Sequence, residues 1–379
     1  MKREIFAIVI VSILITALVI TQLGNDEKTP PDENTELIIE TVAKNLTVPW
    51  DIAFASEDKI FVTERPGKIR TIVDETLQTE PWAQPETYAQ GEAGLLGIAL
   101  HPEFSKNGLV YIYHTYRIQG DPIKNRIVRY TDEGEHGEMD QIILDNIPAG
   151  NIHDGGRIEF GPDGKLYATT GETGNKELAQ HLDSLAGKIL RINPDGTIPA
   201  DNPFSGSPVW SYGHRNPEGL AWHPETNQLY ATEHGPSGHD ELNRIQKGKN
   251  YGWPEVAGKG NRTQYVDPIL ESGSNTWAPS GTTSYHSEKI EGWKNDLFFA
   301  TLGFTPGAGR RSIHRVSLSD NNPNLVTNHI MLLSNQFGRL RAVAEGPEGN
   351  LYLTTSNRDG RGTPVASDDR ILKITGKDE

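Results

Sequence analysis

The chain has 379 residues and no cysteine, which excludes a disulfide framework and any cysteine metal ligand. Its formal net charge of -15 argues against binding nucleic acid through a general electrostatic field, so no nucleic-acid partner is expected. The 39 glycines and 24 prolines imply many turns and favour an all-β protein built from short strands.

The N-terminus has the pattern of a membrane segment. Lys2 and Arg3 precede an apolar run from Ile5 to Thr21. At about 1.5 Å per residue, a helix over this run nearly spans a hydrocarbon core of about 30 Å. The basic flank predicts a cytoplasmic N-terminus and an outward-facing remainder. Residues 1–23 are therefore predicted to be a hydrophobic anchor helix that makes the membrane a partner and holds the protein outside the cytoplasm. The alternative is a cleaved signal peptide and a secreted protein.

Residues 24–36 are polar, contain a Pro-Pro pair and lack large apolar side chains. This composition is typical of a flexible linker. Residues 37–379 are then expected to form the globular domain.

A two-strand pattern recurs through the globular part. A short apolar strand leads into a turn rich in Pro, Asp, Glu or Gly, and a second alternating strand follows. The six copies begin at Trp50, Gly97, Arg157, Gly219, Thr282 and Arg341. Their spacing of roughly 45 to 65 residues is near or above the length of one propeller blade. The chain is therefore predicted to be a six-bladed β-propeller, with an irregular pair of β-sandwiches as the other interpretation.

The most unusual segments lie just before or after these strands, where propeller loops build a binding site. His153 is followed by Asp154 and two glycines, which allow the backbone to approach a ligand closely. An imidazole at such a place can take up a proton near neutral pH. A histidine that only hydrogen-bonds to a turn is the alternative.

Cationic and amide side chains follow a similar pattern. Arg215 and Asn216 precede Pro217, and Arg339 and Arg341 alternate on one expected strand, so both of these arginines share a face. Guanidinium groups present planar donors that match carboxylate or phosphate. In so acidic a chain, ordinary ion pairs with Asp or Glu are the competing explanation.

Two weaker signals concern calcium. Gly235 and Pro236 offer only backbone carbonyls, which a turn can direct at a hard cation such as Ca²⁺. Asp240, Glu241 and the carbonyl of Tyr251 are candidates for a second, structural Ca²⁺ site, although a solvated acidic loop is the simpler interpretation. The sequence has no serine elbow, zinc helix, P-loop or dinucleotide motif.

Four motifs together resemble the quinoprotein sugar dehydrogenases, the glucose/sorbosone dehydrogenase group, over about residues 46–374. They are Gly94–Gly97 (GLLG), Ala186–Asn193 (AGKILRIN) with Asp195–Pro199 (DGTIP), Gly213–Pro217 (GHRNP) and Asn250–Pro254 (NYGWP). The fold of that family is a six-bladed propeller, in agreement with the repeat.

The resemblance implies a cofactor, pyrroloquinoline quinone (PQQ), held together with Ca²⁺. It implies that His153 is the general base toward the C1 hydroxyl of an aldose, that hydride passes to the quinone, and that Ca²⁺ acts as a Lewis acid. The implied cofactor-binding residues are Arg215, Asn216, Arg339 and Arg341, and the implied calcium ligands are the carbonyls of Gly235 and Pro236.

The chain departs from the family pattern in three places. Residues 301–311 contain no lysine where the family usually has one, leaving Arg310 or Arg311 as candidates. Glu92 stands where the best-known members have Gln, and Ile152 stands where some have Asp. The expected function is oxidation of an aldose to its lactone, with electrons leaving to an external acceptor. A Ca²⁺-dependent lactonase and a non-catalytic sugar- or protein-binding propeller are the alternatives.

Overall fold

The computed structural model describes residues 36–303 and 311–377. The predicted anchor at residues 1–23 lies outside these ranges, as does Arg310. Across the two ranges, no helix has both the length and the apolar character needed to cross a membrane.

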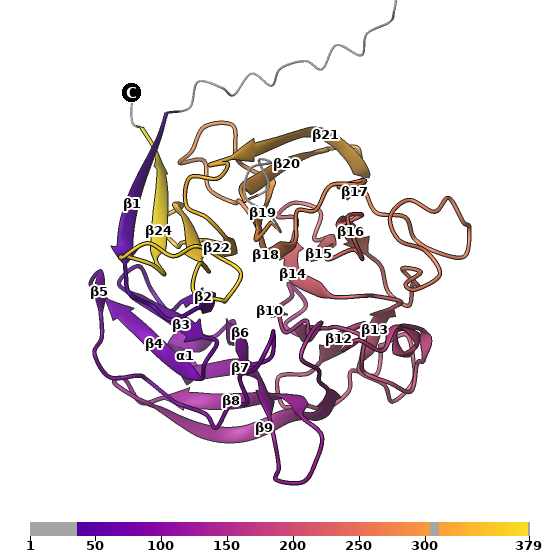
Figure 1. Ribbon diagram of the computed structural model, residues 1–379, viewed down its shortest axis with the longest axis horizontal. Coiled ribbons are helices and arrows are strands. Elements are labelled where there is room, and N and C mark those ends of the chain that lie inside the picture. The colour runs from indigo at the N-terminus through magenta and orange to yellow at the C-terminus, as the bar shows by residue number, and fades with distance from the viewer. Residues whose placement is uncertain (1–35, 304–310, 378–379) are drawn as a thin grey trace, which may run out of the picture.

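The described residues form six four-stranded antiparallel sheets arranged around a central axis (Figure 1). The first three sheets, each from the axis outward, are β2 (Pro49–Phe54), β3 (Lys59–Glu64), β4 (Lys68–Val73) and β5 (Thr76–Leu77); β6 (Leu95–Leu100), β7 (Leu109–Tyr116), β8 (Lys124–Asp132) and β9 (Gly137–Pro148); and β10 (Ile158–Phe160), β11 (Leu166–Thr170), β12 (Lys188–Ile192) and β13 (Val209–Tyr212).

The other three are β14 (Pro217–Trp222), β15 (Leu229–Glu233), β16 (Glu241–Ile245) and β17 (Leu270–Glu271); β18 (Pro279–Ser284), β19 (Leu297–Thr301), β20 (Ile313–Ser319) and β21 (Asn322–Leu332); and β22 (Leu340–Glu345), β23 (Leu351–Thr355), β24 (Ile371–Gly376) and β1 (Leu37–Ala43). Two short helices, α1 (Phe104–Asn107) and η1 (Lys176–Gln180), lie in loops. The first strand of each sheet contacts the first strands of both adjoining sheets, so the ring is closed. The predicted six-bladed propeller is confirmed, and the six repeated strand pairs are the two inner strands of its blades.

The ring is closed by strands from both ends of the described chain. β1 pairs antiparallel with β24, with Leu37 opposite Gly376 and Ile39 opposite Ile374. In Figure 1 the indigo β1 lies beside the yellow β24. The sixth sheet therefore needs residues more than 300 positions apart in the sequence. The repeat predicted the inner strands of this blade but not the origin of its outer strand.

The core lies in the wedges between adjacent sheets. Between the second and third sheets, for example, Tyr111, Ile158 and Leu190 are completely buried in one cluster. Strands such as β7 are buried along almost their whole length because a sheet covers each face. Burial of this kind contributes about 25 cal/mol for each Å² of apolar surface removed from water.

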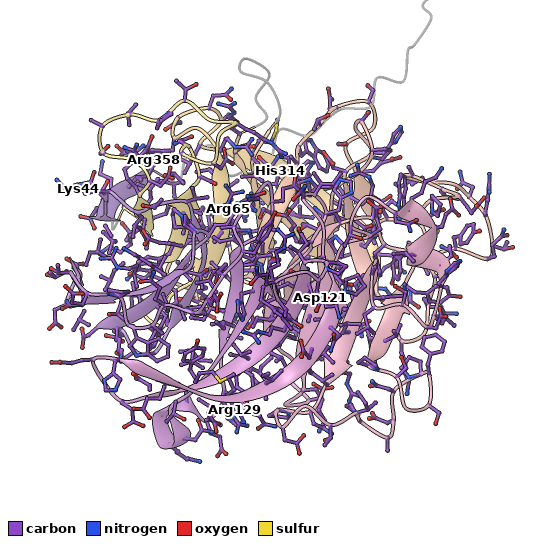
Figure 2. The ribbon with its side chains drawn as sticks, turned by 60° about the horizontal axis from the view of Figure 1, so that its bottom comes forward. Lys44, Arg65, Asp121, Arg129, His314 and Arg358 are labelled. Carbon is purple, nitrogen blue, oxygen red and sulfur yellow. The ribbon has the colours of Figure 1, made fainter. Side chains whose placement is uncertain are left out.

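All six inner strands run in the same direction along the axis, since each one starts an equivalent antiparallel sheet. We call the face where they begin the site face, because the loops before β10, β14 and β22 carry His153, Arg215 and Arg339 there. The face where the inner strands end is called the far face. Arg65, in the turn between β3 and β4, also returns to the site face. Figure 2 shows it toward the middle of the ring, with Lys44 at the rim.

Candidate functional site

His153 is held in a defined orientation by two carboxylates. Its backbone adopts the left-handed conformation, with φ 58°. Its N–H donates to Glu92 Oε2 at 2.8 Å, and its Nδ1 is hydrogen-bonded to the carboxylate of Glu172. Glu172 also accepts the N–H of Gly174 at 3.1 Å and is almost completely buried. These contacts fix the ring and leave Nε2 without a partner among the described residues, as a general base requires.

A close backbone contact supports this arrangement. A Cβ atom added at Gly171 would overlap the carbonyl oxygen of His153. Gly171 therefore lets the segment after β11, which carries Glu172, pass close to the backbone of the histidine loop.

We expect Gly171→Ala to displace His153 from Glu172, lowering kcat by at least tenfold and the free energy of unfolding by about 1–3 kcal/mol. Gly376→Ala is the matched control, since a Cβ there meets only ordinary contacts at 3.7 Å. Measurement of kcat and Tm for both variants checks this. Unchanged kinetics in the Gly171 variant would contradict the positioning role of this contact.

Asn216 joins the histidine loop to β14. Its Oδ1 accepts the N–H of Gly155 at 3.0 Å, and its Nδ2 donates to Glu218 Oε1 at 3.1 Å. The side chain is 1% exposed. The amide predicted to bind cofactor therefore also has a structural role, holding the loop of the predicted base against an inner strand.

Arg215 lies beside the loop that carries Gly235 and Pro236. Its N–H donates to the carboxylate of Glu233, and its Nη1 donates to the carbonyl of His234 at 3.2 Å. The guanidinium carbon is 5.4 Å from the ring centre of Trp253. Its Nε is buried without a hydrogen-bond partner, and burial lowers the pKa of the group. This guanidinium has an unused donor suited to an anion.

Arg339 and Arg341 lie on the site face, but each already has an acidic partner. Arg339 Nε donates to Asp359 Oδ2 at 2.7 Å, and Arg341 Nη1 donates to Glu218 Oε2 at 2.9 Å. The ion pairs that the sequence left open as an alternative are therefore present. Arg341 nevertheless keeps a buried Nε without a partner.

Arg339 and Arg341 form one cluster with Arg65, which belongs to none of the sequence motifs. The pKa of Arg65 is lowered by burial and by the charge of Arg341, and the pKa of Arg339 is lowered by burial and, despite Asp359, by Arg341 as well. Arg65 follows the end of β3 directly, and Glu172 lies two residues beyond the end of β11. A charged residue in the loop just after a second strand was the signal that could have identified both Arg65 and Glu172.

The predicted calcium residues lie around a small hollow next to Arg215. Gly235, Pro236, Glu241 and Tyr251 line it together with Glu233. Burial, reinforced by the charge of Glu233, raises the pKa of Glu241 to about 8. The described residues contain no group of three or more His, Asp or Glu side chains arranged to hold a metal. Any calcium here would therefore need backbone carbonyls.

Asp240, the remaining acidic candidate, is used by the backbone. Its carboxylate accepts the N–H groups of Gly235 at 2.8 Å, Trp277 at 2.6 Å and Ala278 at 2.9 Å. This carboxylate shapes the Gly235 loop.

Comparison with known proteins identifies the family. The sequence family described as Glucose / Sorbosone dehydrogenase matches residues 46–367, which is most of the chain. The protein belongs to the glucose/sorbosone dehydrogenase family. It is therefore an oxidoreductase with the propeller fold of that family.

Three relatives show how far the similarity extends. The PQQ-bound aldose sugar dehydrogenase of Streptomyces coelicolor is 38% identical, with a TM-score of 0.78 over 90% of this chain and 99% of that one. An aldose sugar dehydrogenase of Escherichia coli is 32% identical over 85% of this chain and 91% of its own length. The quinoprotein glucose dehydrogenase B of Acinetobacter calcoaceticus is 36% identical over 60% of this chain and 54% of its own.

Two of the positions that depart from the glucose/sorbosone dehydrogenase pattern, Glu92 and Ile152, adjoin the histidine. Glu92 bridges the N–H of His153 and Arg361 Nη1, the latter at 2.9 Å. Burial favours its neutral form, but the His153 N–H and the charge of Arg361 hold its pKa below the usual value. Ile152 is exposed beside it. Glu92 therefore contributes a negative charge at the histidine loop where a glutamine would contribute none.

Proposed function

We propose that the protein is a PQQ- and Ca²⁺-dependent dehydrogenase that oxidises an aldose at C1 to the lactone and passes electrons to an external acceptor. The observation that carries this proposal is the geometry of His153, whose Nδ1 is held by Glu172 while Nε2 stays available beside a cluster of buried arginines. PQQ-bound and quinoprotein relatives support the choice of cofactor.

The residues present fit an anionic cofactor. PQQ is a flat tricarboxylate, and the buried Nε atoms of Arg215 and Arg341 have no hydrogen-bond partner among the described residues. A buried donor without a partner is unfavourable, and a carboxylate of the cofactor would remove that cost. PQQ would be held by the four predicted cofactor-binding residues, Arg215, Asn216, Arg339 and Arg341. The carbonyls of Gly235 and Pro236 would hold Ca²⁺, with Glu241 and Tyr251 at a second calcium site.

When bound, PQQ supplies the hydride acceptor and Ca²⁺ the Lewis acid. The protein supplies the proton chemistry. His153 Nε2 takes the proton of the C1 hydroxyl as the C1–H bond breaks. Glu172 keeps Nδ1 protonated and stabilises the imidazolium that forms, in the way a carboxylate orients the histidine of other acid–base pairs.

One assay separates this function from its alternatives. Purified protein is incubated with PQQ and Ca²⁺ and then given an aldose and a redox dye. Dye reduction that requires both PQQ and Ca²⁺ is expected. Lactone hydrolysis without PQQ would instead indicate a lactonase, and inactivity in both assays would indicate a binding protein. Either result would contradict the proposal.

We also propose that residues 1–23 anchor the enzyme to the membrane with the propeller outside the cytoplasm. Lys2, Arg3 and the apolar run that follows support this placement. Cell fractionation checks it. Recovery of the protein in the cytoplasmic fraction would contradict it, and recovery in the medium would indicate a cleaved signal peptide.

A further inference from the structure

A second hollow lies on the propeller axis at the far face, opposite His153. Its volume is about 650 Å³. It is lined by the last residues of the inner strands and the turns that follow them, including Phe54 of β2, Phe160 of β10, Trp222 of β14 and Glu345 of β22.

A buried layer separates this cavity from the site face. Arg157 pairs with the carboxylate of Asp51, and its guanidinium carbon lies 4.3 Å from the ring centre of Trp50. Arg341 approaches the same indole at 5.6 Å. This layer contains residues at or just before the beginning of inner strands, namely Trp50, Arg157 and Arg341. The residues that line the cavity come later along the inner strands, nearer the far face. The far-face cavity is therefore distinct from the site of His153.

The lining combines aromatic rings with negative charge. Phe54, Phe160 and Trp222 contribute rings, and the two acidic residues are Glu159 and Glu345. No lysine or arginine is among the lining residues. Aromatic faces together with a carboxylate attract an organic cation, through the ring quadrupole and through charge.

Glu159 is the distinctive group of the cavity. Its side chain is open to the hollow and has no hydrogen bond or ion pair with any described residue, whereas its neighbour Ile158 is completely buried in the core. The side chain is exposed, but the walls of the hollow surround it and raise its pKa by desolvation, an effect that the charge of Asp51 reinforces and that of Arg157 opposes. Glu159 is exposed within the hollow, so its carboxylate is free to pair with a ligand cation there.

Glu345 is already engaged by the protein. Its carboxylate accepts the N–H groups of His286 and Ser287, each at 2.8 Å, and contacts His286 Nδ1 at 2.8 Å. Glu159 is thus the acidic group in the lining that remains available to a ligand.

We propose that the far-face cavity binds a small organic cation, an amine or quaternary ammonium with an apolar body, whose charge lies on Glu159 and whose body packs against Phe54, Phe160 and Trp222. The net charge of -15 favours the approach of such a cation. This site is independent of the dehydrogenase chemistry proposed for the site face.

Binding of the cation in the far-face cavity should weaken as the pH is lowered. Because the pKa of Glu159 is raised, lowering the pH protonates its carboxyl, and a bound cation must displace that proton, so the affinity falls as the pH is lowered. Burial lowers the pKa of both His101 and His223, so both rings are neutral near pH 7 and become repulsive only in acid. The titratable or charged groups around Glu159 are Asp51, Arg157, Glu345, His101, His223 and His286.

Isothermal titration calorimetry with benzyltrimethylammonium tests the proposal. At pH 8.5 we expect saturable 1:1 binding by the wild type and at least tenfold weaker binding by Glu159→Gln. Binding by the wild type at pH 6.5 should be at least fivefold weaker than at pH 8.5. Glu288→Gln removes a charge from the exposed surface and should bind like the wild type, and His153→Ala should also bind normally because the cavity is separate.

Three results would overturn the proposal. They are the absence of saturable binding by the wild type, equal affinity in Glu159→Gln, and loss of binding in His153→Ala. The Tm of Glu159→Gln gives a further check. Because Glu159 has no partner, the variant should be at least as stable as the wild type, and a large fall in Tm would show that the residue has a structural role instead.

Discussion

Replacement of His153 by alanine is expected to lower kcat for aldose oxidation by about 10²–10⁴-fold, the usual contribution of a general base. The affinity for PQQ should stay within about threefold of the wild type, because the predicted cofactor contacts come from arginines and an amide on other loops. Dye-linked kinetics and a fluorescence titration with PQQ measure the two quantities separately.

Two further variants make this test specific. Glu172→Gln keeps a hydrogen-bonding group beside Nδ1 but removes the charge that stabilises imidazolium, so kcat should fall by a smaller factor than in His153→Ala. His136→Ala removes an exposed histidine that lies near Glu138 and should leave kcat unchanged. Wild-type turnover by His153→Ala would remove the basis of the proposed mechanism.

Glu218→Ala is expected to cause the largest loss of stability among the substitutions considered, about 3–5 kcal/mol in the free energy of unfolding, because it leaves a buried cation unpaired. Glu218 accepts hydrogen bonds from Arg341 Nη1 at 2.9 Å, Ser280 Oγ at 2.9 Å and Asn216 Nδ2 at 3.1 Å. It therefore joins three inner strands or their loops. Denaturant unfolding of the variant measures the effect, and Glu288→Ala, an exposed carboxylate paired with Lys294, should leave the transition unchanged.

The lowered pKa of Glu218 also predicts how the stability of the protein responds to acid. Burial opposes ionisation of Glu218, but the charges of His234 and Arg341 and the bond from Ser280 hold its pKa at about 2. A carboxyl whose pKa is lower in the folded state stabilises the protein above its unfolded pKa of about 4.3 and loses this effect as the pH falls toward 2. The stability difference between the wild type and Glu218→Gln should therefore shrink between pH 5 and pH 2. A constant difference would contradict this assignment.

Local patterns in the sequence were enough to predict the fold. In four of the six blades the inner strand and its partner are joined by only four to six residues, so their alternation and their Pro, Asp and Gly turns are visible in one stretch, as in Arg157–Tyr167. The outer strand of the sixth blade was not predicted, because β1 lies far in sequence from β24 and carries no copy of the repeat. The pairing of two strands so far apart in the sequence cannot be inferred from a local repeat.

The sequence by itself determined the six-bladed propeller, the loop of His153 and the loops of the arginines, because glycines, prolines and strand alternation act over a few residues. Only the tertiary structure decided what those side chains contact. Glu172 orients His153, Glu218 and Asp359 take up part of the charge of Arg341 and Arg339, and Glu159 is left alone in a cavity on the far face. The Glu218–Arg341 contact joins two blades, and the other two pairs join the loops before and after the inner strands of one blade. The energies of all three depend on burial, which exists only once the ring has closed.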